Sequence, residues 1–412
     1  MQFEPIYRRV FDNGLVLVSE KVPWTERIEI NIGIKVGSAY ELPEEEGAAH
    51  FLEHLMWKRE NRKETNTRSA LVDKHGVSLN AEIKYEFVYL TIAASENELD
   101  VVFDTVKNDF QTYEILPGEF DTEKELILNE IKSQLEDPSI FGDDKVQEKL
   151  FKGTRLENPK IGRYDSVGEL SQDTIFSFKQ KWYVPNNIVV SVVGNFDEKK
   201  LADVISKNLG SLVYKEVNKP SIVLPRFKKE TSIINSKGLE LNHLFVGFKP
   251  VHADLLVREY LELIDNILDR GECALLNQEF REKSGLSYSI NTNLYNIFED
   301  ICYFYFELTS EFHKARKLED KLIKLFDVLK EGNFSKKRFE DAKNLWKYHF
   351  KKKFFENLED RAEELLRFEL IGADMDYREL PQRIDAMTYE KTQEYSREFF
   401  SKPYVMVKLV HE

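Results

Sequence analysis

The sequence predicts an α+β protein made of two related domains, each a mainly antiparallel sheet packed against helices. Three observations predict it. The chain has 412 residues, which is more than one hydrophobic core usually serves. Segments with the two-residue period of strands alternate with segments of helical period. A short motif also occurs twice, from Lys74 to Ser78 and from Lys283 to Ser287, about half a chain apart.

The division into domains follows from the change of pattern in the middle of the chain. Between about residues 211 and 236 the periodicity loosens, and Pro220 and Pro225 interrupt it. We therefore predict an N-terminal domain over residues 1–212, a linker over 213–235 and a C-terminal domain of related fold over 236–412.

The elements of the N-terminal domain are predicted from local patterns. Acidic residues at 44–46, next to Pro43, favour the start of a helix because anions complement the helix dipole. Strands are predicted at 14–18, 28–34, 88–93 and 189–193, and helices at about 48–58, 96–110 and 120–135.

Charge and composition exclude several classes of protein. The formal net charge of -14 argues against a nucleic-acid partner, whose phosphates need a broad basic surface. No stretch approaches the roughly 20 apolar residues that span a membrane, and the amino terminus has no apolar signal segment. Cys273 and Cys302 stand far apart in the sequence, so we expect no disulfide framework and a cytoplasmic location.

A helix with two histidines carries the chemistry. In the segment 48–55, His50 and His54 stand four residues apart and Glu53 directly precedes the second histidine. At about 100° per residue these three side chains fall on one helix face, whereas Leu52 and Leu55 point elsewhere. Two imidazoles and a carboxylate that can accept a proton from water suit zinc. The order His-x-x-Glu-His is the inverted zincin motif. The alternative is a solvated polar face, but the apolar flanks favour a buried helix whose polar groups need partners.

A third protein ligand must come from elsewhere in the chain. The predicted helix at 120–135 offers Glu123 and Glu130, which are seven residues apart and share a face. Each of them could equally be a surface charge, because this region is rich in acids. The spacing alone does not select one.

Several further motifs resemble one known family. They are the segments 13–15, 37–41, 50–54, 123–130, 183–187 with Gly194, and 281–288. With them the chain resembles the pitrilysin/insulysin family of inverted zincin metallopeptidases, and most closely its mitochondrial-processing-peptidase-like branch. The motifs occur in the family's order through both halves of the chain.

The resemblance implies a complete zinc site. In that family the third ligand is a glutamate about 76 residues after the second motif histidine, which is Glu130 here, and a supporting glutamate precedes it by seven, which is Glu123. The resemblance therefore implies one zinc ion per chain, held by His50, His54 and Glu130. Glu53 would activate the water that hydrolyses a peptide bond in an unfolded polypeptide or oligopeptide.

The resemblance also implies residues that bind the peptide substrate. Family members use an arginine and a tyrosine seven apart, which match Arg281 and Tyr288, to hold the substrate backbone and the oxyanion. Asn80 and Ala81 match an edge strand on which the family lays its substrate. The chain departs from the family pattern at residues 58–60 and at Ile83, which puts substrate preference and the local loop geometry in doubt.

The length of the chain bears on assembly. Longer relatives enclose the substrate between two halves, so the resemblance implies a homodimer in which Arg281 and Tyr288 of one subunit complete the zinc site of the other. Two rival interpretations are a catalytically silent structural or partner-binding subunit of the same fold and a binding module with a purely structural zinc. Structural zinc sites are closed by four protein ligands, often with cysteine, and neither cysteine lies near the motif.

Overall fold

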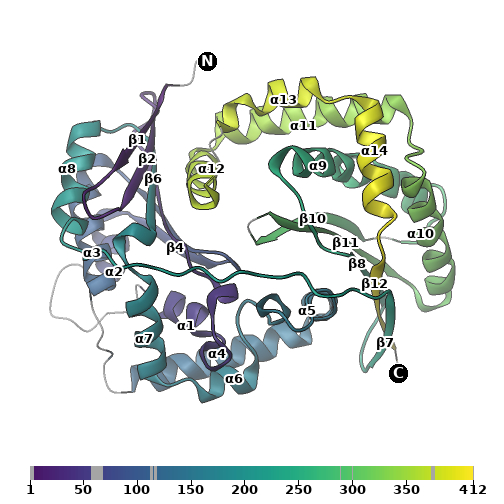
Figure 1. The fold of residues 1–412 in the computed structure, drawn as a ribbon, viewed down its shortest axis with the longest axis horizontal. Helices are drawn as coiled ribbons and strands as arrows, with labels where there is room; N and C mark the ends of the chain where they lie inside the picture. The colour runs from purple at the N-terminus through teal and green to yellow at the C-terminus, as the bar shows by residue number, and fades with distance from the viewer. Residues whose placement is uncertain are drawn as a thin grey trace. The chain divides into compact units, whose positions relative to one another are not determined.

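The computed structural model describes residues 4–56, 68–111, 115, 118–287, 289–298, 300–372 and 376–411 (Figure 1). The chain divides into two compact units. The first unit is formed by residues 1–132, 159–221 and 352–377, and the second by 133–158, 222–351 and 378–412.

The first unit is built on a six-stranded sheet with the order β1-β2-β6-β3-β5-β4. Its strands are β1 (Ile6–Val10), β2 (Val16–Lys21), β3 (Ile28–Ile34), β4 (Ser78–Ile83), β5 (Val88–Ala94) and β6 (Ile188–Gly194). Only the β2–β6 pair is parallel among these strands. Strand β4 forms one edge of the sheet, which leaves its outer backbone groups available for another strand.

Helices cover both faces of this sheet. They are α1 (Ala48–Leu55), α2 (Arg68–His75), α3 (Leu99–Gln111), α4 (Glu119–Glu136), α6 (Tyr164–Glu169), α7 (Gln172–Trp182), α8 (Glu198–Leu209) and α12 (Leu358–Ile371). Helices α3 and α8 lie on one side of the sheet and α12 on the other (Figure 1). The α12 side contains a buried polar cluster: Arg361 pairs with the buried carboxylate of Glu20, and the Tyr377 hydroxyl donates to the same carboxylate at 2.6 Å.

The second unit has a sheet of the same topology. Its path is β10-β11-β8-β12-β7, with β9 paired to β11. The strands are β7 (Glu230–Ser236), β8 (Asn242–Phe248), β9 (Val251–His252), β10 (Ile290–Phe298), β11 (Ile301–Ser310) and β12 (Tyr404–His411). Read from β7, the order matches β2-β6-β3-β5-β4 of the first unit, and the β7–β12 pair is parallel as β2–β6 is. Equal topology supports the duplication that the repeated motif predicts.

The helices of the second unit pack around an aromatic core. They are α5 (Pro138–Leu150), α9 (Leu255–Asp269), α10 (Ala315–Lys330), most of α11 (Lys336–Glu356), α13 (Leu380–Ala386) and α14 (Tyr389–Phe400). Phe248, Phe304 and Phe306 of the sheet are fully buried against α10 and α14. The predicted α+β class, with a sheet and helices in each half, is confirmed.

The units do not follow the chain in the simple order that the predicted boundaries suggest. The chain passes from the first unit to the second near residue 221, inside the predicted linker 213–235, but the end of that linker forms β7 from Glu230. The predicted linker is therefore too long. The sequence of β7 is rich in polar residues and therefore does not predict a strand. The strand forms because β7 pairs with β12, which lies at the far end of the chain. Residues 133–158 belong to the second unit although they precede the predicted linker. Residues 352–377 belong to the first unit although they follow it.

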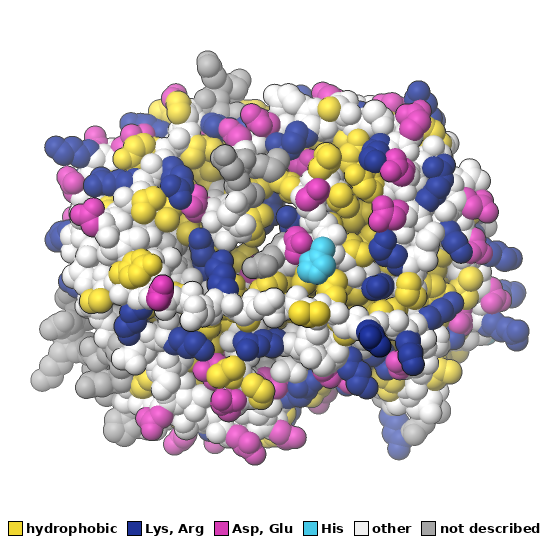
Figure 2. Space-filling view, viewed as in Figure 1, with side chains coloured by type: hydrophobic (Ala, Val, Ile, Leu, Met, Phe, Trp, Pro, Cys, Tyr) yellow, Lys and Arg dark blue, Asp and Glu magenta, His cyan; other side chains and the backbone are white. Residues whose placement is uncertain are grey.

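On the face shown in Figure 2, lysine and arginine side chains are interspersed with aspartate and glutamate. Among the described helices, none combines the length and the apolar character needed to cross a membrane.

Candidate metal centre

Helices α1 and α4 lie together and bring the predicted site residues to one place. The rings of Phe51 on α1 and Phe120 on α4 stack with centroids 4.8 Å apart. Ile127 and Ile131 are buried on the same helix α4. This apolar contact fixes which face of α4 meets α1, so that Glu130 points towards the two histidines.

The three predicted ligands form a compact triangle of donor atoms. The Nε2 atoms of His50 and His54 lie 3.2 Å apart. A carboxylate oxygen of Glu130 lies 3.2 Å from the Nε2 atom of His54 and 3.7 Å from that of His50. Ligand bonds of 2.0–2.1 Å to a tetrahedral zinc ion would place donor atoms about 3.3 Å from one another. The three residues therefore fit zinc in both donor type and spacing.

Glu123 holds the second histidine in a defined orientation. Its Oε1 atom lies 2.7 Å from the Nδ1 atom of His54, and the carboxylate is buried. Because Nδ1 donates its hydrogen to this carboxylate, Nε2 is the ring atom that can donate an electron pair to a metal.

Glu53 lies beside the triangle and outside it. One of its carboxylate oxygens is 3.9 Å from the Nε2 atom of His50 and 3.9 Å from that of His54. These distances exceed those of direct hydrogen bonds, so Glu53 is not hydrogen-bonded to either Nε2 atom. The geometry suits a residue that accepts a proton from water near the centre.

The two histidines differ in their affinity for protons. Burial, together with the neighbouring His54, lowers the pKa of His50 to about 4, against the opposing influence of Glu130. Burial also acts against a charge on His54, but the hydrogen bonds with Glu123 and Glu130 outweigh it and raise the pKa of His54 to about 9. In the metal-free protein at neutral pH, His50 is therefore neutral and His54 is protonated.

This difference predicts a proton-linked metal affinity. A ligating imidazole must be neutral, so zinc has to displace the proton of His54 at any pH below about 9. We expect the apparent zinc affinity to rise about tenfold per pH unit between about pH 5 and 8, with one proton released per zinc. Calorimetry in buffers of different ionisation enthalpy measures that number directly. An affinity independent of pH over this range would contradict the assignment of His54 as a ligand.

Comparison with known proteins identifies the family. A model of insulinase (peptidase family M16) matches residues 16–163, and a model described as the peptidase M16 inactive domain matches 169–345. An uncharacterized zinc protease of Rickettsia felis is 30% identical over 285 residues, which cover 68% of each chain. The chain belongs to the M16 peptidase family. The zinc protease YmxG of Bacillus subtilis, also uncharacterized, is 24% identical over 406 residues, or 97% of each chain.

Solved structures show that the M16 fold extends over the whole chain. A protease from Helicobacter pylori has a TM-score of 0.92 at 21% identity and matches 99% of this chain and 100% of its own. A peptidase M16 inactive domain from Pseudomonas fluorescens has a TM-score of 0.89 at 13% identity and matches 99% and 98%. A protease and a protein described as an inactive domain thus share this fold, so the fold alone does not determine activity. Activity depends on the residues of the site.

The other predicted site residues of this M16 chain lie in three different settings. Asn80 is exposed and Ala81 half-buried on the edge strand β4. Arg281 lies exposed in the second unit, in the helical turn Asn277–Glu282. Tyr288 and residues 58–60 lie outside the described residues, whereas Ile83 is buried at the end of β4.

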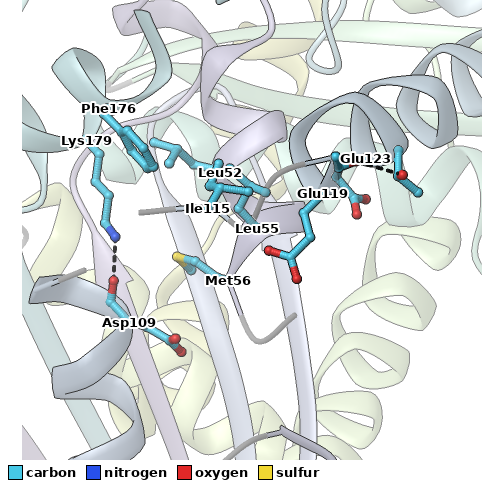
Figure 3. Close-up of a pocket in the computed structure, with 11 residues that line it drawn as sticks. Leu52, Leu55, Met56, Asp109, Ile115, Glu119, Glu123, Phe176 and Lys179 are labelled. Atoms are coloured by element: carbon cyan, nitrogen blue, oxygen red, sulfur yellow. Dashed lines mark hydrogen bonds between the residues drawn. The ribbon is translucent and has the colours of Figure 1, made fainter. Parts of the chain in front are cut away.

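The face of α1 opposite the histidines borders a cavity of about 410 Å³. Figure 3 shows Leu52 and Leu55 of α1 and the C-cap residue Met56 on one side of it and Lys179 on another, with the Lys179 ammonium donating to the backbone carbonyl of Asp109. The sequence predicts that this apolar flank is buried. Leu52 and Met56 are buried, whereas Leu55 is half-buried beside the cavity.

The sequence does not predict a role for two buried carboxylates near α1. Glu41 and Glu46 are both buried. Glu41 accepts hydrogen bonds from the backbone N–H groups of Gly47 and Ala49 at the start of α1, and Glu46 accepts one from the backbone N–H of Arg163. The motif 37–41 marks the region, but the sequence gives no sign that the Glu41 side chain reaches the amides six and eight residues further on.

Proposed function

We propose that this M16 chain is a zinc-dependent endopeptidase that hydrolyses unfolded polypeptides or oligopeptides. One observation carries the proposal. Three donor atoms of His50, His54 and Glu130 lie at spacings that suit one zinc ion, and the carboxylate of Glu53 stands beside them without completing the ligand set. An open position of this kind is typical of catalytic zinc sites, whereas structural sites are closed by four protein ligands.

The residues of the site have separate tasks in this reaction. When bound, zinc would lower the pKa of a water molecule and polarise the carbonyl of the peptide bond. Glu53 accepts a proton from that water and later delivers it to the leaving amine. Glu123 keeps the His54 ring in one tautomer and one orientation throughout, because its carboxylate holds the Nδ1 hydrogen.

The substrate is proposed to bind in an extended conformation. Strand β4 lies at the edge of the first sheet, and a peptide can pair with its free backbone groups. Such pairing favours unfolded chains, since a folded protein rarely offers a free strand. This mode of binding and the roles of Asn80 and Ala81 rest on the edge position and on the family resemblance.

Pairing of two chains is a further part of the proposal. Arg281 and Tyr288 are proposed to complete the zinc site of a partner copy. In support of pairing, the whole of this chain matches only 48% of the Escherichia coli periplasmic protease PqqL, at 19% identity and a TM-score of 0.79, so one PqqL chain is about as long as two copies of this chain. The mitochondrial-processing-peptidase-like branch and a cytoplasmic location stay predictions. Mixing inactive Glu53→Gln and Tyr288→Phe proteins should restore one working site per mixed dimer. No recovery after verified subunit exchange would contradict shared sites.

A second candidate function is a silent subunit that binds partners. The Pseudomonas fluorescens structure described as an inactive domain favours it, because that protein shares the fold at a TM-score of 0.89. The complete triangle of donor atoms favours the enzyme. The discriminating experiment is to digest a mixed peptide library with the zinc-loaded protein and map the cuts by mass spectrometry. Zinc near one per chain with cuts that a chelator suppresses supports the peptidase, and absence of both supports the silent subunit.

A further inference from the structure

The metal-binding helix α1 is held at its amino end by a carboxylate from outside the helix. It has only eight residues, and a helix this short is not stable alone. Its N-cap residue is Gly47, which has no side chain to cap the first turn. Instead the carboxylate of Glu41 accepts hydrogen bonds from the backbone N–H of Gly47 and of Ala49, each at 2.8 Å.

Within the described part of the chain, the hydrogen-bond partners of Glu41 are backbone amides and none is a cationic side chain. Only 6% of the residue is exposed, and Glu46 and Glu45 are acidic neighbours. Burial raises the pKa of Glu41 well above its usual range, and the two amides at the helix start oppose that rise. The positive end of the helix dipole therefore supports the carboxylate, and the carboxylate in turn fixes where the helix begins.

A second carboxylate fixes the loop that covers the same helix end. One oxygen of Glu46 accepts a hydrogen bond from the backbone N–H of Arg163 at 2.9 Å. Gly162 lies so close that a Cβ atom there would stand 2.8 Å from the Cα atom of Gly47.

We propose that Glu41 and the loop 161–163, anchored by Glu46, are positioning elements that set the zinc affinity of the site through His50. Glu41 accepts a hydrogen bond from the backbone N–H of Ala49, directly before His50, and the loop packs at Gly162 against Gly47, the N-cap residue of α1. Together they hold the helix turn that carries this ligand. The inference rests on the proposed function, because it assigns His50 to a zinc ion.

The first test replaces Glu41 with glutamine and compares it with Glu44→Gln. Both changes remove one acidic charge from the same turn, but Glu44 is exposed. Glutamine has a single acceptor oxygen, so one of the two amides at the helix start loses its partner. We expect the zinc dissociation constant, measured by competition with a chromogenic chelator, to rise about 10- to 100-fold for Glu41→Gln and less than about twofold for Glu44→Gln. We also expect kcat to fall while KM changes little.

The second test uses glycines, in case Glu41→Gln does not fold. Gly162 and Gly153 both have φ of 81°, so alanine is equally strained at either position. Only at Gly162 would the new Cβ atom also press on the start of α1, since nothing lies within 4 Å of the corresponding point at Gly153. We expect weaker zinc binding for Gly162→Ala than for Gly153→Ala, together with a lower melting temperature of the metal-free protein, because the clash displaces the start of α1.

The outcomes separate this inference from the proposed function. If Glu41→Gln and Gly162→Ala bind zinc as tightly as their controls, the positioning role is overturned, even where the melting temperature falls. If the parent protein binds zinc but cuts no peptide, the peptidase proposal fails while the comparison of zinc affinities still decides the inference. If the parent protein binds no zinc, both are overturned.

Discussion

Replacement of Glu53 by glutamine is expected to abolish peptide hydrolysis while zinc stays bound. Glutamine keeps the size of the side chain but cannot accept and return a proton at neutral pH. The carboxylate of Glu53 lies 3.9 Å from both Nε2 donor atoms, so its loss leaves the triangle of ligands intact. We expect kcat to fall by about 10³-fold or more, towards the upper end of what general-base catalysis contributes.

The measurement needs activity and zinc content from the same preparation. Turnover of an unfolded peptide is followed at saturating substrate, and zinc per chain is measured by inductively coupled plasma mass spectrometry after gel filtration. Glu44→Gln removes the same charge from an exposed site and should retain full activity. Undiminished turnover by Glu53→Gln would refute its role as the base, and loss of zinc would indicate that Glu53 serves as a ligand instead.

The elements that carry this chemistry could be predicted because their signals are local. The alternating segment that forms β3 spans Ile28–Ile34, as predicted, and α4 starts and ends within one residue of the predicted 120–135. The motif on α1 needs only the geometry of a single helix. Glu130 was different, because its seven-residue spacing from Glu123 left two candidates and only the family resemblance chose between them.

What could not be predicted depends on contacts between distant segments. The helix α12 lies late in the chain but packs on β2, β3 and β6 of the first unit, and no local pattern in its sequence indicates that placement. The acids at 44–46 correctly mark a helix start, but the direct cap is Glu41. The left-handed turn at Gly47 brings the first amides of α1 back to that side chain, and no local pattern reports such a turn.

Replacement of Glu130 by alanine is expected to remove zinc binding and, with it, activity. Loss of an outer residue that orients a ligand typically weakens metal binding 10- to 100-fold, so loss of a ligand itself should exceed about 100-fold. The change also acts on the metal-free protein, because Glu130 is one of the two hydrogen-bond partners that raise the pKa of His54 to about 9. Without it, the pKa of His54 should fall while the bond to Glu123 remains.

These two effects oppose each other, which makes the experiment informative. A lower pKa of His54 reduces the competition between protons and zinc, so proton competition alone would strengthen zinc binding in the variant. If Glu130 only tuned His54, the variant would bind zinc at least as tightly as the parent protein at pH 6. If Glu130 is a ligand, binding is lost at pH 6 and at pH 8 alike. Chelator competition at both pH values, with Glu125→Ala at an exposed position of α4 as control, distinguishes the two roles.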